Sequence, residues 1–299
     1  MLRLRQNGAY NKDQEIKMAT FFNQATLSFG GTLTNSNVVS GEITDALSAT
    51  KTAVSVSYGS SDGVAYVISI VNAGTSDSTD ITVTDDLGAF TYGALTLTPL
   101  TYIDGTLSYY VNGVLQPAPT AVAGPPLVIS DITVPAGGNA LIIYEARVNS
   151  FADMTAGSVI TNTASVTGTC INSVISTSVT VGEETELSIS KAVCPDQITC
   201  QGELSYTFVI QNTGNTEAVA TDDVIITDVF NPIFSEISVT YNGSVWTEGV
   251  NYTYDATTGA FATLPGQITV PAASYTRDPA TGAVTLTPGT AEIKVTGTV

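Results

Sequence analysis

Short runs of alternating apolar and polar residues recur along the chain. Residues 63–74, GVAYVISIVNAG, alternate Tyr, Val and Ile with small or polar side chains and end in Asn-x-Gly. This period of two is typical of a half-buried β-strand, because successive side chains point to opposite faces. Asn-Gly pairs in residues 111–114 and 241–244 predict two-residue hairpin turns. The pattern therefore predicts many short strands and an all-β fold.

The strand pattern occurs twice. LSATKTAV matches LSISKAVC and aligns Lys51 with Lys191, and the motif ITVPA is repeated verbatim. The matched segments are 47–54 with 187–194, 63–74 with 202–214, 81–86 with 224–229, and 132–136 with 268–272. A repeat of this kind, with strands at this spacing, predicts two immunoglobulin-like β-sandwich domains in tandem, at residues 47–182 and 187–299.

The two copies differ at their ends. The first copy continues through a closing segment, residues 159–181, whereas the second reaches PGTAEIKVTGTV at residue 299 without one. A similar segment precedes the first copy: residues 22–41 match residues 161–180, which aligns Asn23 with Asn162. The sequence therefore predicts that residues 18–46 form an N-terminal donor-strand arm and that the second domain lacks its closing strand.

These motifs resemble a surface repeat family of bacteria and archaea known as domain of unknown function eleven. They are Lys51 on a first strand, the Y-x5-N-x-G motif of residues 66–74, Thr84 with Asp85, and TNTA at residues 161–164. The resemblance covers nearly all of residues 47–299. It implies an immunoglobulin-like fold and a role in surface architecture, and it implies no single activity.

Composition excludes several classes of function. The 299 residues include 27 acidic and nine basic side chains and no histidine, for a net charge of -18. Without histidine, Ser-His-Asp catalysis and imidazole metal sites are excluded. A polyanion is a poor partner for nucleic acid or anionic lipid, and no apolar run reaches the roughly 20 residues of a membrane span. We expect no nucleic acid partner, no membrane insertion, no cofactor and no metal.

Catalysis would have to rest on carboxylates. The doublets Asp85 with Asp86 and Asp222 with Asp223 are the candidates for an acid-base pair or calcium ligands. Neighbours on a strand point to opposite faces, so such doublets do not converge by themselves. The sequence favours a protein that is not an enzyme.

A sandwich without its last strand exposes unpaired backbone groups beside an apolar groove. A strand from another copy would complete it, and this heterologous contact would propagate into an open filament. The donor residues are expected to be Phe22, Asn23, Ala25, Leu27, Phe29 and Leu33. The sequence thus predicts a structural subunit of an extracellular, cell-surface or spore-surface filament that polymerises head to tail with copies of itself.

Two alternatives remain open. The chain could be a pair of surface repeats whose arm is an ordinary linker. It could also be a surface adhesin or carbohydrate-binding module that does not polymerise, with Trp246, Tyr241, Tyr252 and Tyr254 as an aromatic platform. Those aromatic residues are also compatible with sandwich core and cross-strand pairs.

Lysine, aspartate and asparagine recur at matched positions. In the first repeat, Asp85 and Asn162 are the matched partners of Lys51. In the second repeat, Asp228 is the matched partner of Lys191, and Asn23 of an incoming arm takes the position of Asn162. A buried Lys beside Asn and a neutral carboxylic acid resembles the arrangement that forms isopeptide bonds in immunoglobulin-like surface proteins. The alternative is a Lys-Asp ion pair, with Asn satisfying a turn.

The cysteines and the N-terminus carry weaker signals. Cys194 and Cys200 bracket the turn PDQIT and are candidates for a disulfide, which leaves Cys170 unpaired; inert thiols are the alternative.

Residues 1–17 carry four basic residues without an apolar stretch, and their composition differs from that of the residues after Met18. We therefore expect residues 1–17 to be an upstream extension before a true start at Met18.

Overall fold

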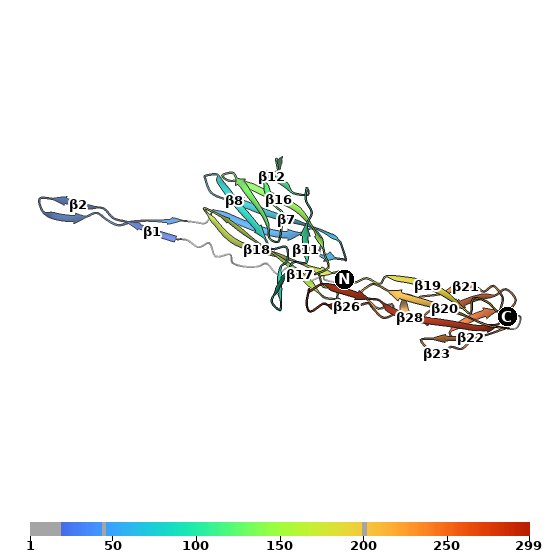
Figure 1. The fold of residues 1–299 in the computed structure, drawn as a ribbon. Helices are drawn as coiled ribbons and strands as arrows, with labels where there is room; N and C mark the ends of the chain where they lie inside the picture. Colours follow the sequence, from blue (N-terminus) through green and yellow to red (C-terminus); the bar gives the residue numbers. More distant parts are fainter. Residues whose placement is uncertain (1–18, 44–45, 199–201) are drawn as a thin grey trace, which may run out of the picture.

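The computed structural model describes residues 19–43, 46–198 and 202–299, with the backbone alone at residues 19–20 and 42–43. Within these ranges the elements are β-strands, apart from one short 3-10 helix, η1 (Ala220–Asp222). The strands form two sandwiches that follow one another along the chain, with a separate N-terminal arm (Figure 1). The predicted all-β tandem fold is confirmed.

The first sandwich packs two six-stranded sheets face to face. One contains β13 (Val114–Gln116), β12 (Ser108–Val111), β16 (Asn139–Val148), β7 (Gly63–Asn72) and β5 (Leu47–Ala53) in that order, with β11 (Leu100–Tyr102) also paired to β16. The other contains β14 (Thr120–Val122), β15 (Leu127–Val134), β8 (Ser78–Asp85), β17 (Val159–Gly168), β18 (Ile171–Val181) and β6 (Ser57–Tyr58). Alternate residues of both sheets, such as Ile68 on β7 and Val83 on β8, are fully buried between them.

The second sandwich repeats one sheet of the first. Its strands β23 (Ser244–Val245), β22 (Glu236–Tyr241), β28 (Gly289–Thr298), β20 (Glu203–Asn212) and β19 (Leu187–Cys194) have the same order as β13, β12, β16, β7 and β5. The facing sheet is smaller and contains β24 (Tyr252–Asp255), β25 (Ala260–Thr263) and β21 (Thr227–Val229). Phe230, Phe234 and Phe261 pack against one another in the core between the sheets.

The repeated motifs have matching local structures. In the Asn-x-Gly motif that ends β7, the Asn72 side chain accepts from the Gly74 N–H at 2.9 Å and donates to the Ser76 carbonyl at 2.9 Å. Asn212 makes the same two bonds, from the Gly214 N–H at 2.9 Å and to the Thr216 carbonyl at 2.7 Å. Each motif thus satisfies the backbone where a buried strand turns.

Both predicted hairpin turns are present. Asn112 and Gly113 have φ of 50° and 77° between β12 and β13, and Asn242 and Gly243 have φ of 46° and 79° between β22 and β23. Positive φ at both turn residues matches the right-handed twist of the flanking strands.

The N-terminal arm is a long two-stranded ribbon. Strand β1 (Ala19–Asn23) pairs with β4 (Val39–Ile43), and β2 (Thr26–Phe29) pairs with β3 (Thr32–Asn35). The chain reverses at Gly30 and Gly31, which both have positive φ. The ribbon projects away from both sandwiches (Figure 1), and its described side chains are exposed apart from the half-buried Gly41. The segment predicted to be a donor-strand arm is thus a hairpin in the free chain.

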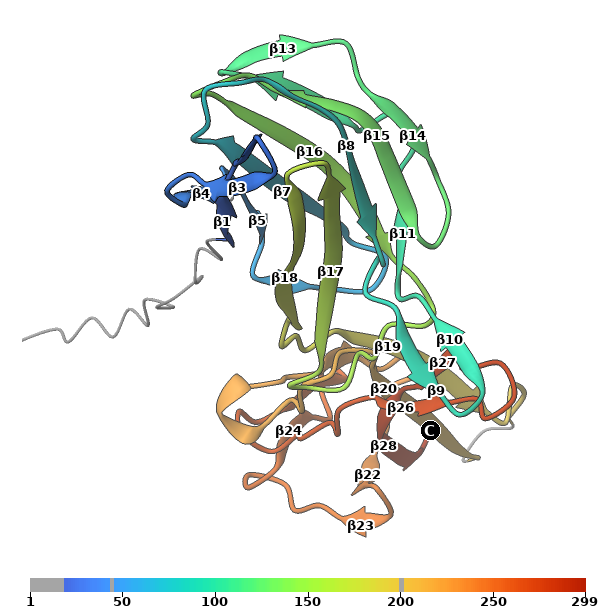
Figure 2. The ribbon, with the colours of Figure 1, turned by 90° about the vertical axis from the view of Figure 1, so that its left-hand side faces the viewer.

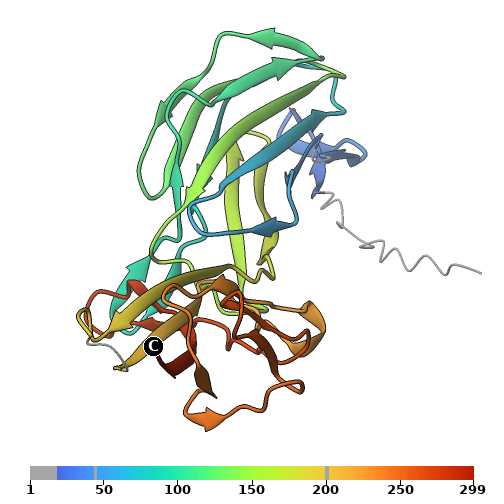
Figure 3. The same cartoon turned by 90° about the vertical axis from the view of Figure 1, so that its right-hand side faces the viewer.

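A small ribbon holds the two sandwiches together. It consists of β26 (Ser274–Arg277) and β27 (Val284–Thr287), and it reaches back to the first sandwich. Arg277 donates to the Phe151 carbonyl at 3.1 Å and lies 5.1 Å from the ring centre of Phe90 on β9 (Phe90–Tyr92), which pairs with β10 (Leu95–Leu97). Figure 3 shows the second sandwich directly following the first.

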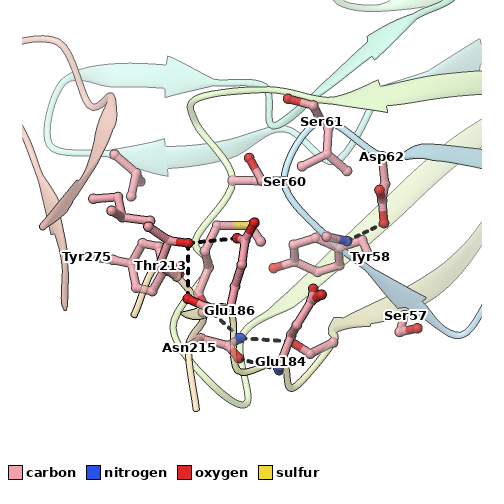
Figure 4. A pocket seen from close by; sticks show the side chains of 18 of the residues that line it. Ser57, Tyr58, Ser60, Ser61, Asp62, Glu184, Glu186, Thr213, Asn215 and Tyr275 are labelled. Atoms are coloured by element: carbon pink, nitrogen blue, oxygen red, sulfur yellow. Dashed lines mark hydrogen bonds between the residues drawn. The ribbon is translucent and has the colours of Figure 1, made fainter. Parts of the chain in front are cut away.

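Beside this ribbon the two sandwiches enclose an open hollow of about 800 Å³. Figure 4 shows Tyr58 from the first sandwich and Thr213 and Tyr275 from the second around it. Asn215 donates to the Gly182 carbonyl at 2.8 Å and accepts from the Glu184 N–H at 2.9 Å. These bonds fix the connecting segment to the second sandwich, so the joint is built from specific contacts as well as from the linker.

Candidate functional site

The two sandwiches differ by one hairpin. In the first, β17 pairs with β8, where Ala164 faces Asp85, and with β18, which lies against β5. Figure 2 shows β17 and β18 side by side in the first sandwich. In the described part of the second sandwich no strand takes their place: β21 pairs with β25 alone and β19 with β20 alone.

The missing hairpin leaves an open groove, which we define as the surface between β19 and the free edge of β21. On β5, Leu47 and Ala49 are buried, whereas their counterparts Leu187 and Ile189 on β19 are 38% and 56% exposed. Further exposed apolar residues of the second sandwich are Val193, Val219, Ile225, Val229 and Ile233. Exposed apolar residues near an unpaired strand edge are typical of a binding site for another strand.

Beneath the hairpin of the first sandwich lies a buried polar cluster. Lys51 Nζ donates to Asp85 Oδ2 at 2.6 Å, and neither side chain is exposed. The Tyr144 hydroxyl donates to the same oxygen, and Asn162 Nδ2 donates to the Tyr144 hydroxyl at 3.3 Å. Burial lowers the pKa of Lys51, against the opposing effect of Asp85. The structure thus brings together the three residues that the sequence matched in the first repeat.

Two buried oxygens of this cluster lack a hydrogen-bond partner among the described residues, the Tyr66 hydroxyl and Asn162 Oδ1. The side chain of Asn162 is buried, and among the described residues its Oδ1 accepts no hydrogen bond. A buried carbonyl left in this way costs about 1 to 3 kcal/mol, so a donor at this position would stabilise the fold.

The second sandwich has the same ion pair in the open groove. Lys191 donates to Asp228, but their side chains are 39% and 19% exposed. The ammonium lies 4.2 Å from the ring centre of Tyr206, 5.4 Å from that of Phe208 and 5.5 Å from that of Phe230. Aromatic rings therefore line the buried side of this ion pair, and its other side is exposed to solvent.

The arm has the register of the missing hairpin. Its tip pairs Phe29 with Thr32 across a two-residue turn, as Gly168 pairs with Ile171 in the first sandwich. The pair Thr26 with Asn35 corresponds in the same alignment to Ser165 with Val174. Towards the base, Asn23 pairs with Val39, one residue later than the match to Asn162 and Thr177 predicts. A one-residue bulge accounts for this shift.

This register assigns the two faces of the arm. Ile160, Asn162, Ala164 and Val166 on β17 point inward, and they align with Phe21, Asn23, Ala25 and Leu27. The aromatic ring of Phe21 lies over its cross-strand partner Gly41.

Two of the expected inward anchors lie on the other face. Phe22 aligns with the exposed Thr161, and Leu33 aligns with the exposed Asn172. The sequence prediction included Phe22 and omitted Phe21. The alternation of Phe21 with Asn23 and Ala25 already indicated that these three residues share one face.

The four aromatic residues of the alternative binding platform do not form one exposed surface. Tyr252 is buried in the second core and Tyr254 packs against it, so only Tyr241 remains stacked on Trp246, with ring centres 5.0 Å apart. Cys194 is exposed at the end of β19, and Cys200 lies outside the described residues, so their disulfide stays a prediction. The extension at residues 1–17 also lies outside the described residues.

Residues 19–43, 46–198 and 202–299 contain no group of three or more metal-binding side chains arranged around a common point. They also contain no helix with the length and apolar character of a membrane span.

No family model and no curated protein matches the chain, so the resemblance to domain of unknown function eleven stays a prediction. Solved structures give distant likenesses. A collagen-binding domain from a Staphylococcus aureus adhesin is 14% identical with a TM-score of 0.29, over 44% of this chain and 96% of that one. The pilus backbone protein RrgB of Streptococcus pneumoniae is 11% identical with a TM-score of 0.31, over 79% of this chain and 50% of that one. Such low scores assign neither fold nor function.

Proposed function

We propose that the protein is a structural subunit of an extracellular filament on a cell or spore surface. In this proposal the arm at residues 18–46 completes the second domain, residues 187–299, of the next copy, and residues 47–182 form the intervening domain. The single observation that carries it is the match between the open groove and the arm. The second sandwich has no counterpart of the β17–β18 hairpin among its described residues. The arm is a free hairpin whose turn has the same register as the β17–β18 turn.

The arm cannot fill the groove of its own chain. Ile43 ends the ribbon and Leu47 begins β5, so the connection spans at most about 14 Å. The first sandwich, whose longest strand has 11 residues and measures about 36 Å, lies between the arm and the second sandwich (Figure 1). Only another copy can bring an arm to the groove.

The contact joins two different surfaces, so it does not close on itself. Each copy offers one arm and one groove, and a heterologous contact between them generates an open chain of subunits. Ladder hydrogen bonds to the free edge of β21 would fix the register, and the alternate side chains of the arm would fill the groove.

Apolar burial supplies the driving force. Phe21, Leu27 and Phe29 on the arm are 51%, 68% and 83% exposed in the free subunit. Covering an apolar side chain fully gives about 1.5 to 3 kcal/mol. The arm is already a hairpin before binding, which lowers the ordering cost that a disordered donor would incur.

Negative-stain microscopy of the full chain, beside a shortened chain that begins at Ala46, tests the proposal. We expect fibres from the full chain at high concentration and monomers from the shortened one. A full chain that stays monomeric, or a shortened chain that forms fibres, would contradict the proposed function.

A further inference from the structure

The Lys-Asp pairs of the two sandwiches differ in the side chains that lie beside them. Tyr144 faces Tyr66 across β16 and β7 and donates to Asp85, whereas the matched position opposite Tyr206 is Val295. The second site therefore lacks the hydroxyl that stabilises the carboxylate of the first. Phe230 and Phe234 pack beside Tyr206 there, so the surroundings of Asp228 and Lys191 are more apolar.

The arm would carry an amide to this pair. In the first sandwich Ala164 pairs with Asp85, and Asn162 projects from the same face of β17 two residues earlier. In the arm Ala25 and Asn23 hold the same positions. Seating the arm with Ala25 opposite Asp228 therefore directs Asn23 towards Lys191 and Asp228.

From this juxtaposition, and resting on the proposed function, we infer that the groove is a self-modification site in which Lys191 forms an amide bond with Asn23 of the next subunit. The bond would link successive subunits covalently along the filament. Lys191 is the nucleophile, Asn23 the electrophile, and Asp228 the residue that carries the proton.

Assembly triggers the reaction. In the free subunit the Lys191 side chain is 39% exposed, so water solvates the ammonium and the ion pair persists. The seated arm excludes this water, and removing water from an ion pair favours the neutral acid and amine. A proton then passes from Lys191 Nζ to Asp228, which leaves a neutral amine beside the Asn23 amide.

The reaction balances without an external reagent. The Nζ lone pair attacks Cγ of Asn23 and forms the new C–N bond while the Asp228 acid donates a hydrogen bond to Oδ1. A proton from Nζ then moves through the Asp228 carboxyl to the amide nitrogen. The Cγ–Nδ2 bond breaks and ammonia leaves, and Asp228 ends as the neutral acid with the proton that it took from the Lys191 ammonium. Each link therefore lowers the mass by about 17 Da, one ammonia.

The test uses fibres of the full chain, boiled in detergent with reductant and then separated on a gel. We expect a ladder of dimers, trimers and larger species. Proteolysis should release a branched peptide that joins Lys191 to Asn23 and weighs about 17 Da less than its two parts. The reductant removes any disulfide contribution from Cys170, Cys194 or Cys200.

Two variants and a matched control separate the link from the assembly. Asn23→Ala removes the electrophile and Lys191→Arg removes the nucleophile but keeps the charge. Both should still form fibres by microscopy, and these should boil to monomers. The control Gln24→Ala, on the neighbouring position of the arm, should keep the ladder.

The outcomes are distinguishable. Wild-type fibres that boil entirely to monomers overturn the covalent link and leave the proposed function standing. A ladder that persists in Asn23→Ala also overturns this assignment. Absence of fibres from every form of the chain overturns both proposals.

Discussion

Lys51 and Lys191 occupy matched positions on β5 and β19, and the covering hairpin makes the difference between them. Under β17 and β18, Lys51 is fully enclosed with Asp85, and Asn162 completes the cluster. Without such a cover, Lys191 is open to solvent. The same residue types therefore have a buried polar environment in one domain and a partly hydrated one in the other.

For the first sandwich, we expect the Lys51 amine to react with the Asn162 amide once the domain folds. The monomer should then weigh about 17 Da less than its sequence, because one ammonia leaves. Intact-mass spectrometry measures this directly, and Asn162→Ala should restore the full sequence mass. A wild-type mass equal to the sequence mass would show that the Lys51–Asp85 ion pair is the final state.

Removing the carboxylate should lower the free energy of unfolding by different amounts in the two domains. In the Asn162→Ala background, where no amide bond can form, Asp85→Ala leaves Lys51 buried without a partner, which we expect to lower the free energy of unfolding by about 3 to 5 kcal/mol. The matched variant Asp228→Ala should lower it by less than about 1 kcal/mol, because solvent already screens Lys191. Urea unfolding of both variants as monomers measures the difference, and equal losses would contradict it.

Buried tyrosines predict a loss of stability in alkali. Burial raises the pKa of Tyr58 to about 12, with a smaller effect from Asp153, and burial also raises the pKa of Tyr66 and Tyr144. Above pH 10 these hydroxyls ionise in the unfolded chain before the folded one, so the stability that they contribute is present below pH 10 and is lost as the pH rises above it, for Tyr58 between pH 10 and 12.

The Tyr58→Phe variant tests this pH dependence. Each such tyrosine contributes about 1.4 kcal/mol per pH unit in that window. Urea unfolding at pH 8, 10 and 11 should therefore show a shallower decline for Tyr58→Phe than for the wild type. Identical slopes would contradict the role of Tyr58.

At the scale of elements, the arm presents two faces with different roles. Leu27 aligns with the buried Val166, whereas Leu33 pairs with Ser28 and aligns with the exposed Asn172. Both leucines are exposed in the free subunit, at 68% and 70%. A substitution at either position should therefore leave the monomer stable.

Leu27→Asp and Leu33→Asp form a matched pair. The first would place a charge in the apolar groove and lose at least about 1.5 to 3 kcal/mol of burial, so we expect binding of the arm to weaken by at least about 10- to 100-fold. The second should polymerise like the wild type. Light scattering during assembly measures both, and equal effects would show that the register taken from β17 is wrong.

In the proposed assembly, the donor arm and the acceptor groove lie at opposite ends of the whole molecule. The arm projects from the end of the first sandwich that lies away from the second sandwich (Figure 1). The ribbon β26–β27 and its Arg277 contact fix the two sandwiches to each other, so the joint restrains the orientation of the groove. With the proposed donor and acceptor at opposite ends, we expect such subunits to form an open filament rather than a closed dimer.

A shortened chain that begins at Ala46 should stop growth. It can accept an arm but offers none, so fibre length by microscopy should fall as its proportion rises, with short oligomers at equal amounts. As a control, the shortened chain with Ile189→Asp in the groove should not shorten the fibres. Undiminished fibre length in the presence of the first form would contradict head-to-tail growth.

The sequence alone determined the strands, the repeat and the matched Lys, Asp and Asn positions. Alternation along β7 and the Asn-Gly turns are local properties, since each depends on a few neighbouring residues. The correspondence of Asn23 with Asn162 comes from alignment within the chain and needs no geometry. These features could be read before the fold was known.

Only the tertiary structure decided how those positions are used. It showed that the arm is a hairpin, and that Tyr144 has Val295 as its counterpart. The physical reason is that strand pairing and a one-residue bulge set which face a side chain takes, and they depend on residues far apart in the sequence. The exposure of Lys191 likewise depends on whether other strands cover it. The residues next to Lys191 in the sequence do not show this.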